Sequence, residues 1–166
     1  MQNLIEAKKI SLVFPESSSP LFSGINLFLT DNVQALIGRN GVGKSCLAAI
    51  LADRLQPSEG SLHRFCKVGY LAQGEVVLTG TAADILDVSE IQQVSSRVLA
   101  GEGTPKDFSF MDDKWSWEVE TEALLAEGEL SLDILDRTFK SLSGGEQTRL
   151  KLLALKMQGC DFLILD

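Results

Sequence analysis

Several features of other protein classes are missing from this sequence of 166 residues. Its apolar residues come only in short runs, none long enough to span a membrane as a helix. Residues 1–9 contain no apolar core of a secretory signal. The three cysteines are odd in number and form no C-x-x-C pair, which favours free thiols in a reducing cytosol. The net charge of −8 argues against general attraction to nucleic acid. We therefore expect a cytoplasmic protein.

What the chain does contain is enough apolar residues, 45% of the total, for one globular domain with a core. Apolar alternation predicts strands, and apolar residues at helical spacing predict helices. The predicted strands are residues 8–14, 25–29, 33–37, 61–65, 68–72 and 161–166. Helices are predicted over 44–55 and 115–127, a capping box at Thr81-x-x-Asp84 and a loop over 101–113. This order predicts an α/β core with a helical insertion.

The most informative segment is Gly38-Arg39-Asn40-Gly41-Val42-Gly43-Lys44-Ser45, which has the pattern G-x-x-x-x-G-K-[ST]. It lies between the strand predicted at 33–37, expected to be buried, and the helix that follows. Glycines let backbone N–H groups turn inward on phosphates, and a helix start adds partial positive charge. Lys44 can reach the β- and γ-phosphates, and the hydroxyl of Ser45 can ligate Mg²⁺. A Gly-rich turn before a core helix is the alternative without function.

Two further motifs lie near the end of the chain. The segment Leu142-Ser143-Gly144-Gly145-Glu146-Gln147 contains a capping box, Ser143-x-x-Glu146, that needs no function. A cap does not need two glycines, however, and these would let an anion approach the helix start closely. The run Phe162-Leu163-Ile164-Leu165-Asp166 predicts a buried strand that ends in a carboxylate. Asp166 is then expected beside the phosphate loop, where it can hold Mg²⁺.

These three motifs, in this order, resemble the ATP-binding cassette, the nucleotide-binding domain of the ABC superfamily, over essentially the whole chain. The resemblance implies an α/β fold with a P-loop NTPase core of the ABC type, an antiparallel β subdomain, a helical insertion and a missing C-terminal part. Residues 1–166 would then divide into a nucleotide-binding core (1–75), a helical subdomain (76–140) and the signature helix with the Walker B strand (141–166). ATP and Mg²⁺ are the implied cofactors.

The resemblance also implies a role for individual residues. The expected ATP contacts are Gly38, Asn40, Gly41, Gly43, Lys44, Ser45, Cys46 and, by stacking on adenine, Phe14. Phe14 is open to the alternative of a core residue, and Cys46, which replaces the usual Thr, to that of a small residue that fits. The expected metal ligands are Ser45, Asp166 and Gln73, the last resembling the Q-loop glutamine. The signature residues Ser143, Gly144, Gly145 and Glu146 would act in trans on ATP held by a second cassette.

One branch of the superfamily matches further. The stretch 112–118 followed by Glu120, together with 142–150 and 37–41, resembles the ABC-F branch. Its members are soluble proteins with two cassettes in one chain, and they act on ribosomes in translation or in protection from antibiotics. The implied partners are a second cassette and, through parts outside this chain, the ribosome. Two alternatives stay open: the ATP-binding subunit of a membrane transporter, partnered by its membrane domain, and a non-hydrolytic nucleotide-binding module.

The end of the sequence bears on catalysis. In the family, a Glu that polarises the attacking water follows the Walker B Asp, whereas this sequence stops at Asp166. No catalytic residue is therefore identified in this chain. The complete protein is expected to be an ATPase, and this piece to hydrolyse ATP slowly. A sheet edge is also expected to be exposed.

Overall fold

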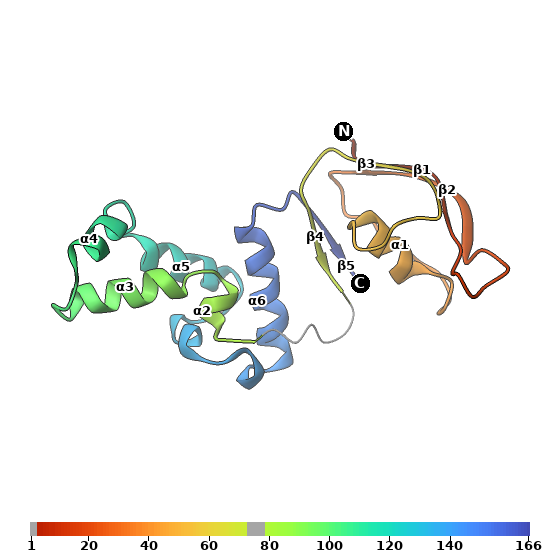
Figure 1. Cartoon of the computed structure of the whole chain (residues 1–166). Coiled ribbons are helices and arrows are strands. Elements are labelled where there is room, and N and C mark those ends of the chain that lie inside the picture. The colour runs from red at the N-terminus through yellow and green to blue at the C-terminus, as the bar shows by residue number, and fades with distance from the viewer. Residues whose placement is uncertain (1–2, 73–78) are drawn as a thin grey trace. The chain divides into compact units, whose positions relative to one another are not determined.

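The structure is a computed structural model that describes residues 3–72 and 79–166. These residues form two compact units (Figure 1). The sheet unit comprises Met1–Glu75 and Gly159–Asp166, and the helical unit comprises Val76–Gln158. The last residues of the chain therefore fold with the first, and the helical unit is inserted between them in sequence.

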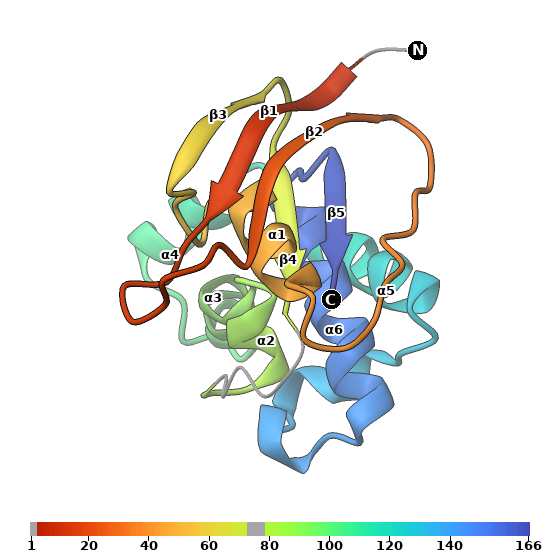
Figure 2. The same ribbon diagram turned by 90° about the vertical axis from the view of Figure 1, so that its right-hand side faces the viewer.

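Three antiparallel strands form one layer of the sheet unit, in the order β2-β1-β3 (Figure 2). They are β1 (Asn3–Leu12), β2 (Phe22–Thr30) and β3 (Glu59–Arg64). The central strand contributes the buried residues Ile5, Ala7, Ile10 and Leu12. These pack with Leu47, Ile50 and Leu51 of helix α1 (Lys44–Leu51) in one apolar cluster. The strands predicted at 8–14, 25–29 and 61–65 are confirmed, with boundaries that differ by a few residues.

A second sheet pairs β4 (Val68–Leu71) with β5 (Phe162–Leu165) in parallel. Tyr70 lies opposite Ile164 in this ladder. Because parallel strands end at the same sheet edge, Asp166 follows β5 at the carboxyl end of both strands, and its N–H donates to the carbonyl of Leu71 at 3.0 Å. Among the described residues, β4 is the only ladder partner of β5, so one edge of β5 is free, as expected.

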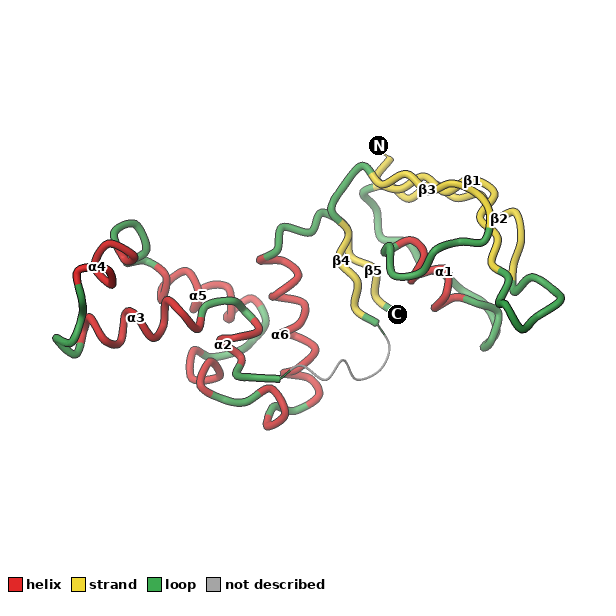
Figure 3. Tube along the Cα trace, viewed as in Figure 1, coloured by secondary structure: helices red, strands yellow, loops and turns green. Residues whose placement is uncertain are grey.

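The prediction of a strand at residues 33–37 is wrong. This segment is loop in the structure (Figure 3), and the exposed fractions of Val33 and Ile37 are 104% and 90%. A hollow of about 600 Å³ separates it from α1 and β5, lined by Gln34, Ala35, Leu36, Leu47, Leu51 and residues 162–166 among others. A strand is stabilised by backbone pairing with a neighbour, and no described residue pairs with this segment. Its apolar composition alone therefore does not bury it.

The helical unit is built from five α-helices and two short 3₁₀ helices in the part of the chain that the structure describes. They are α2 (Ala82–Ile85), α3 (Ser89–Leu99), α4 (Pro105–Met111), α5 (Trp117–Glu127), η1 (Leu132–Asp136), η2 (Phe139–Ser141) and α6 (Gly144–Met157). The fully buried Leu86, Leu125, Ile134 and Leu150 meet in its core. No helix among the described residues is both long and apolar enough to cross a lipid bilayer.

The helix predicted over residues 44–55 ends earlier than expected, at Leu51. The guanidinium group of Arg64 donates to the last carbonyl oxygens of the helix, those of Ile50 and Leu51, at 2.8 Å each. Asp53 then adopts the left-handed conformation with φ 62°. These contacts satisfy the end of the helix and turn the chain away, which periodicity of apolar residues cannot foresee.

The prediction of a loop over residues 101–113 is also wrong, because this segment contains α4. Thr104 caps this helix: its hydroxyl accepts from the N–H of Asp107 at 3.2 Å, and Asp107 accepts from the N–H of Thr104 at 2.9 Å. Pro105 occupies the first helical position, where its missing N–H costs nothing. The pattern Thr-Pro-x-Asp thus starts a helix here, although glycines and proline suggested a loop.

Candidate nucleotide site

The start of α1 has no side-chain cap. Its N-cap residue is Gly43, which has φ 97°, and no acidic residue lies in its first turn. A Cβ atom on Gly43 would come within 2.8 Å of side-chain atoms of Leu21 and Phe22, so conformation and packing both require glycine. The loop of residues 38–42 before it is exposed. Open N–H groups and the positive end of the helix dipole therefore face the surface, as an anion site requires.

Lys44 folds back over this loop. Its ammonium group donates to the carbonyl oxygens of Gly38 and Arg39, at 3.0 and 2.9 Å. These bonds hold a positive charge beside the loop backbone and the start of α1. A phosphate bound at the helix start would exchange these neutral carbonyl partners for charged oxygens, which form stronger bonds with an ammonium group.

Asp166 lies beside α1, as predicted. The hydroxyl of Ser45 donates to Oδ1 of Asp166 at 3.0 Å, and the hydroxyl of Tyr70 donates to Oδ2 at 3.3 Å. Figure 2 shows the end of the chain beside the first turn of α1. Burial and the negative charge of Asp166 raise the pKa of Tyr70, so its phenol keeps its proton. Sequence reasoning gave Tyr70 no role; a hydroxyl on the strand that neighbours the Asp166 strand was the available signal.

The paired groups fit a magnesium ion that binds together with a nucleotide. Mg²⁺ takes oxygen ligands and obtains most of them from phosphates and water rather than from protein. Because the hydroxyl of Ser45 donates a hydrogen bond to Asp166, the lone pairs of its oxygen can face a cation. The described residues contain no cluster of three or more His, Cys, Asp or Glu side chains that could hold a metal ion. When bound, it would offset the charge that develops on phosphate oxygens.

The other predicted ATP contacts have different settings. Phe14 follows β1, lies outside the apolar clusters and is 44% exposed, which excludes the alternative of a core residue. Cys46 is half-buried and packs against the apolar cluster of the sheet unit. Asn40 and Gly41 lie in the exposed turn of the loop. Gln73, the third predicted metal ligand, lies outside the described residues.

The predicted signature residues begin α6 in the helical unit. Ser143 and Glu146 form the expected capping box: the N–H of Glu146 donates to the Ser143 hydroxyl at 3.4 Å, and the N–H of Ser143 donates to Glu146 at 2.6 Å. Arg137 donates to the other carboxylate oxygen at 2.8 Å. The bonds from Ser143 and Arg137 lower the pKa of Glu146 to about 2, so it is ionised at neutral pH. The hydroxyl of Ser143 accepts in this box and keeps its own proton to donate.

The two glycines after Ser143 have no internal role in the helical unit. A Cβ atom on Gly144 would meet nothing within 4 Å, and one on Gly145 would meet only the tip of Arg149, at 4.0 Å. Neither glycine has a positive φ. Alanine stabilises a helix by ~1 kcal/mol relative to glycine. The fold of this unit therefore gives no reason for glycine at either position.

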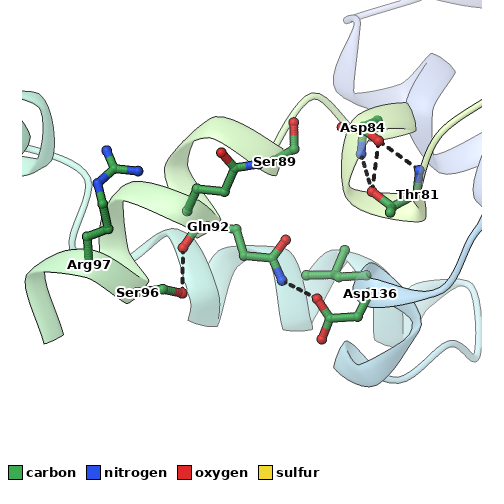
Figure 4. A pocket seen from close by; sticks show the side chains of 9 residues that line it. Thr81, Asp84, Ser89, Gln92, Ser96, Arg97 and Asp136 are labelled. Atoms are coloured by element: carbon green, nitrogen blue, oxygen red, sulfur yellow. Dashed lines mark hydrogen bonds between the residues drawn. The ribbon is translucent and has the colours of Figure 1, made fainter. Parts of the chain in front are cut away.

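A separate polar hollow of about 490 Å³ lies within the helical unit (Figure 4). Its polar groups are bonded to one another: Gln92 donates to Asp136 at 2.9 Å, and Ser96 donates to the carbonyl of Gln92 at 2.8 Å. Arg97, the one cation in its lining, is paired with Asp107 at 2.6 Å. The hollow has no glycine-rich loop and no cation left for an anion, so the sheet unit holds the candidate site.

The chain is similar to a family of known ATP-binding proteins. The profile of the ABC transporter family matches residues 27–166. The chain is 34% identical to the ATP-binding protein Uup of Caulobacter vibrioides over 155 residues, which cover 91% of this chain and 21% of Uup. It is 30% identical to the zinc import ATP-binding protein ZnuC of Vibrio vulnificus over 169 residues, which cover 100% of this chain and 56% of ZnuC.

A third relative, from Encephalitozoon cuniculi, is named as a homologue of ATP-binding cassette sub-family F member 3. It is 26% identical over 160 residues, which cover 95% of this chain and 24% of that protein. The chain thus spans between 21% and 56% of the length of these relatives.

Solved structures show the same fold. A nucleotide-free ATP-binding cassette from an ABC transporter matches with a TM-score of 0.69 and 20% identity, over 99% of this chain and 69% of that one. The fold is therefore that of a P-loop ABC cassette, with the phosphate loop, Ser45 and Asp166 brought together in its α/β part. With the family profile covering most of its length, this chain is an ATP-binding cassette and belongs to the ABC transporter family.

Proposed function

We propose that this chain is part of a cassette of an ABC-F ATPase, which binds ATP with Mg²⁺ in the sheet unit. The observation that carries the proposal is the 3.0 Å bond between Ser45 and Asp166, which joins the end of the phosphate loop to the end of β5. The complete protein would hydrolyse ATP to drive a conformational change on the ribosome.

In this proposal each part of the sheet unit has one task. The N–H groups of residues 41–45 receive the phosphates, and Lys44 turns from its carbonyl partners to the β- and γ-oxygens. The oxygens of Ser45 and Asp166, which lie together, would hold the metal ion. The exposed ring of Phe14 offers a surface on which adenine can stack.

The signature residues would act on a second cassette. Gly144 and Gly145 place no side chain beside the start of α6, and Ser143 retains a hydroxyl proton that can be donated to a phosphate. Glu146 holds that hydroxyl in place through the capping box. The absence of any internal need for the two glycines supports a partner that approaches from outside the chain, for which the phosphate of ATP in a second cassette is our candidate.

Two observations bear on the branch. The Asp-Asp-Lys-Trp-Ser-Trp-Glu stretch at 112–118 and the likeness to a sub-family F homologue favour the ABC-F branch. The likeness to ZnuC, which covers the whole of this chain, favours a second candidate, the ATP-binding subunit of a transporter. In that case the complete protein would pair with a membrane domain rather than with the ribosome.

Equilibrium binding of a fluorescent ATP analogue to the 166-residue chain, with and without Mg²⁺, tests the first part. We expect saturable binding that Mg²⁺ tightens and that Lys44→Ala weakens. Binding that is equal in the wild type and in Lys44→Ala would refute a nucleotide site at this loop. Lys106→Ala, which changes an exposed lysine of α4 in the helical unit, is the matched control and should bind as the wild type does.

Co-sedimentation of the complete source protein with ribosomes tests the branch. We expect it to sediment with ribosomes when ATP hydrolysis is prevented by a non-hydrolysable ATP analogue. Recovery in the membrane fraction together with a membrane-domain protein would instead establish the transporter candidate.

A further inference from the structure

Tyr70 occupies a position in the nucleotide site that no motif of the sequence explained. It lies on β4, directly opposite Ile164 of β5, and its hydroxyl donates to Oδ2 of Asp166 at 3.3 Å. Ser45 of α1 donates to the other oxygen, Oδ1, at 3.0 Å. The carboxylate of Asp166 is therefore held from two sides, by one hydroxyl from the phosphate-binding helix and one from the neighbouring strand.

Holding the carboxylate from both sides matters because Asp166 is otherwise free to turn. It follows the last residue of β5, its side chain is exposed, and its backbone N–H donates to the carbonyl of Leu71. The second torsion of an aspartate side chain is soft, so its own rotamer preference does not select an orientation. With a hydrogen bond to only one oxygen, the carboxylate can still rotate about that bond, whereas hydrogen bonds to both oxygens fix its plane.

We propose that Tyr70 is a positioning residue for the magnesium ion: its hydroxyl fixes the plane of the Asp166 carboxylate so that Oδ1 stays turned toward Ser45. This inference rests on the proposed function, because it assumes that the ion binds with ATP at Ser45 and Asp166. Tyr70 itself touches neither the nucleotide nor the metal in this role. Its ring is half-buried, and only the hydroxyl acts.

The variant Tyr70→Phe removes the hydroxyl and keeps the ring. The measurement is the dissociation constant of Mn²⁺, as a spectroscopic substitute for Mg²⁺, from the 166-residue chain saturated with the non-hydrolysable analogue AMP-PNP, followed by electron paramagnetic resonance. We expect Tyr70→Phe to raise this constant roughly tenfold, as is typical when the partner of a metal-ligating group is lost. Binding of AMP-PNP without metal should stay within about twofold of the wild type, because the phosphate loop is untouched.

A double variant separates positioning from a structural effect. In an Asp166→Asn background, Tyr70→Phe should change the Mn²⁺ constant by less than about twofold, because the group through which Tyr70 acts is already altered. Equal weakening in both backgrounds would overturn the proposal. Thr30→Val, which removes a hydroxyl from β2 of the same unit, is the matched control and should leave Mn²⁺ binding unchanged.

A spectroscopic signal follows Tyr70 alone, because it is the only tyrosine of the chain. Incorporation of 3-fluorotyrosine should give one ¹⁹F resonance, which shifts in Asp166→Asn and broadens when Mn²⁺ binds with AMP-PNP. A resonance that responds to neither change would overturn the contact. If the wild-type chain does not bind AMP-PNP, the proposed function and this role of Tyr70 are both refuted. If the wild-type chain binds AMP-PNP and Tyr70→Phe binds Mn²⁺ as tightly as the wild type, only the role of Tyr70 is refuted.

Discussion

The helical unit and the sheet unit begin their helices in opposite ways. Every described α-helix of the helical unit has an acidic residue in its first turn, and α2, α4 and α6 also have complete capping boxes. Helix α1 of the sheet unit has neither. An acidic side chain in the first turn offsets the positive end of the helix, whereas an uncapped start leaves that end available to an anion. The contrast separates helix starts that carry an acidic residue of their own from the start of α1, which carries none.

The glycines at the two kinds of helix start differ as well. Gly43 is required by its own unit, because its φ is positive and a side chain would strike Leu21 and Phe22. Gly144 and Gly145 have open space around them. A glycine that neither the backbone conformation nor the packing of its own unit requires indicates a constraint from outside that unit. The capping box of α6 therefore does not by itself explain why residues 144 and 145 are glycines.

The largest expected effect is on the stability of the sheet unit. Gly43→Ala should destabilise it by ~2–4 kcal/mol, combining the cost of a left-handed residue with that of overpacking. Gly144→Ala, the matched change, should leave the helical unit unchanged or stabilise it by up to ~1 kcal/mol. Urea unfolding can follow each unit separately, because both tryptophans, Trp115 and Trp117, lie in the helical unit and the single tyrosine lies in the sheet unit. Equal destabilisation by the two variants would contradict the contrast between these glycines.

The next effect is on binding. Lys44→Ala should weaken ATP binding about tenfold to a hundredfold, corresponding to the ~1.5–3 kcal/mol of a hydrogen bond to a charged group. Unfolding of the sheet unit should change little, because the two carbonyl partners of Lys44 lie in an exposed loop and can bond to water. Isothermal titration calorimetry with ATP and Mg²⁺ measures the first quantity. A large loss of stability in this variant would mean that the lysine serves the fold rather than the ligand.

A smaller effect is expected at α6. Ser143→Ala removes the side-chain acceptor of the capping box and should destabilise the helical unit by ~1 kcal/mol. Ser45→Ala, in the first turn of the uncapped α1, should change the stability of the sheet unit by less than ~0.5 kcal/mol, because its bond to Asp166 is exposed. Urea unfolding monitored by tryptophan fluorescence and by the ¹⁹F signal measures the two. If Ser45→Ala cost more than Ser143→Ala, the distinction between capped and bare helix starts would fail.

The parts of the site that the sequence predicts are those with local chemistry. The helix that begins at Lys44 and the capping boxes at Thr81 and Ser143 depend on residues a few positions apart, and each is found. The meeting of Ser45 with Asp166 could be predicted because a parallel strand carries its last residue to the sheet edge that faces the loop.

The remainder depends on partners that are distant in sequence. The segment 33–37 is apolar enough for a strand, but a strand forms only where its backbone pairs with a neighbouring strand. Among the described residues this segment has no such partner. The contact of Tyr70 with Asp166 depends on the register of β4 with β5, which no local pattern gives. The early end of α1 likewise depends on Arg64, from a strand that follows it.

The smallest expected effect is the response to acid. The pKa of Glu146 is lowered to about 2 by its bonds to Ser143 and Arg137, and the pKa of Asp107 lies well below its ordinary range through its bond to Arg97. Such carboxylates stabilise the fold fully above their unfolded pKa, and the contribution is lost as pH falls through the folded pKa. For Glu146 the window therefore runs from pH 4.5 down to about 2.

We expect tryptophan fluorescence to show progressive loss of stability of the helical unit to urea across this window. Glu146→Gln is the matched variant, because glutamine can still accept from the N–H of Ser143 in a capping box but has no proton to gain. It should be less stable than the wild type at neutral pH and should lose less stability between pH 4.5 and about 2. If the stability of the two proteins fell equally with pH, the charge of Glu146 would contribute nothing to the stability of the helical unit. Any stabilisation of its helices by acidic residues in their first turns would then come from Asp107 and the other first-turn acids alone.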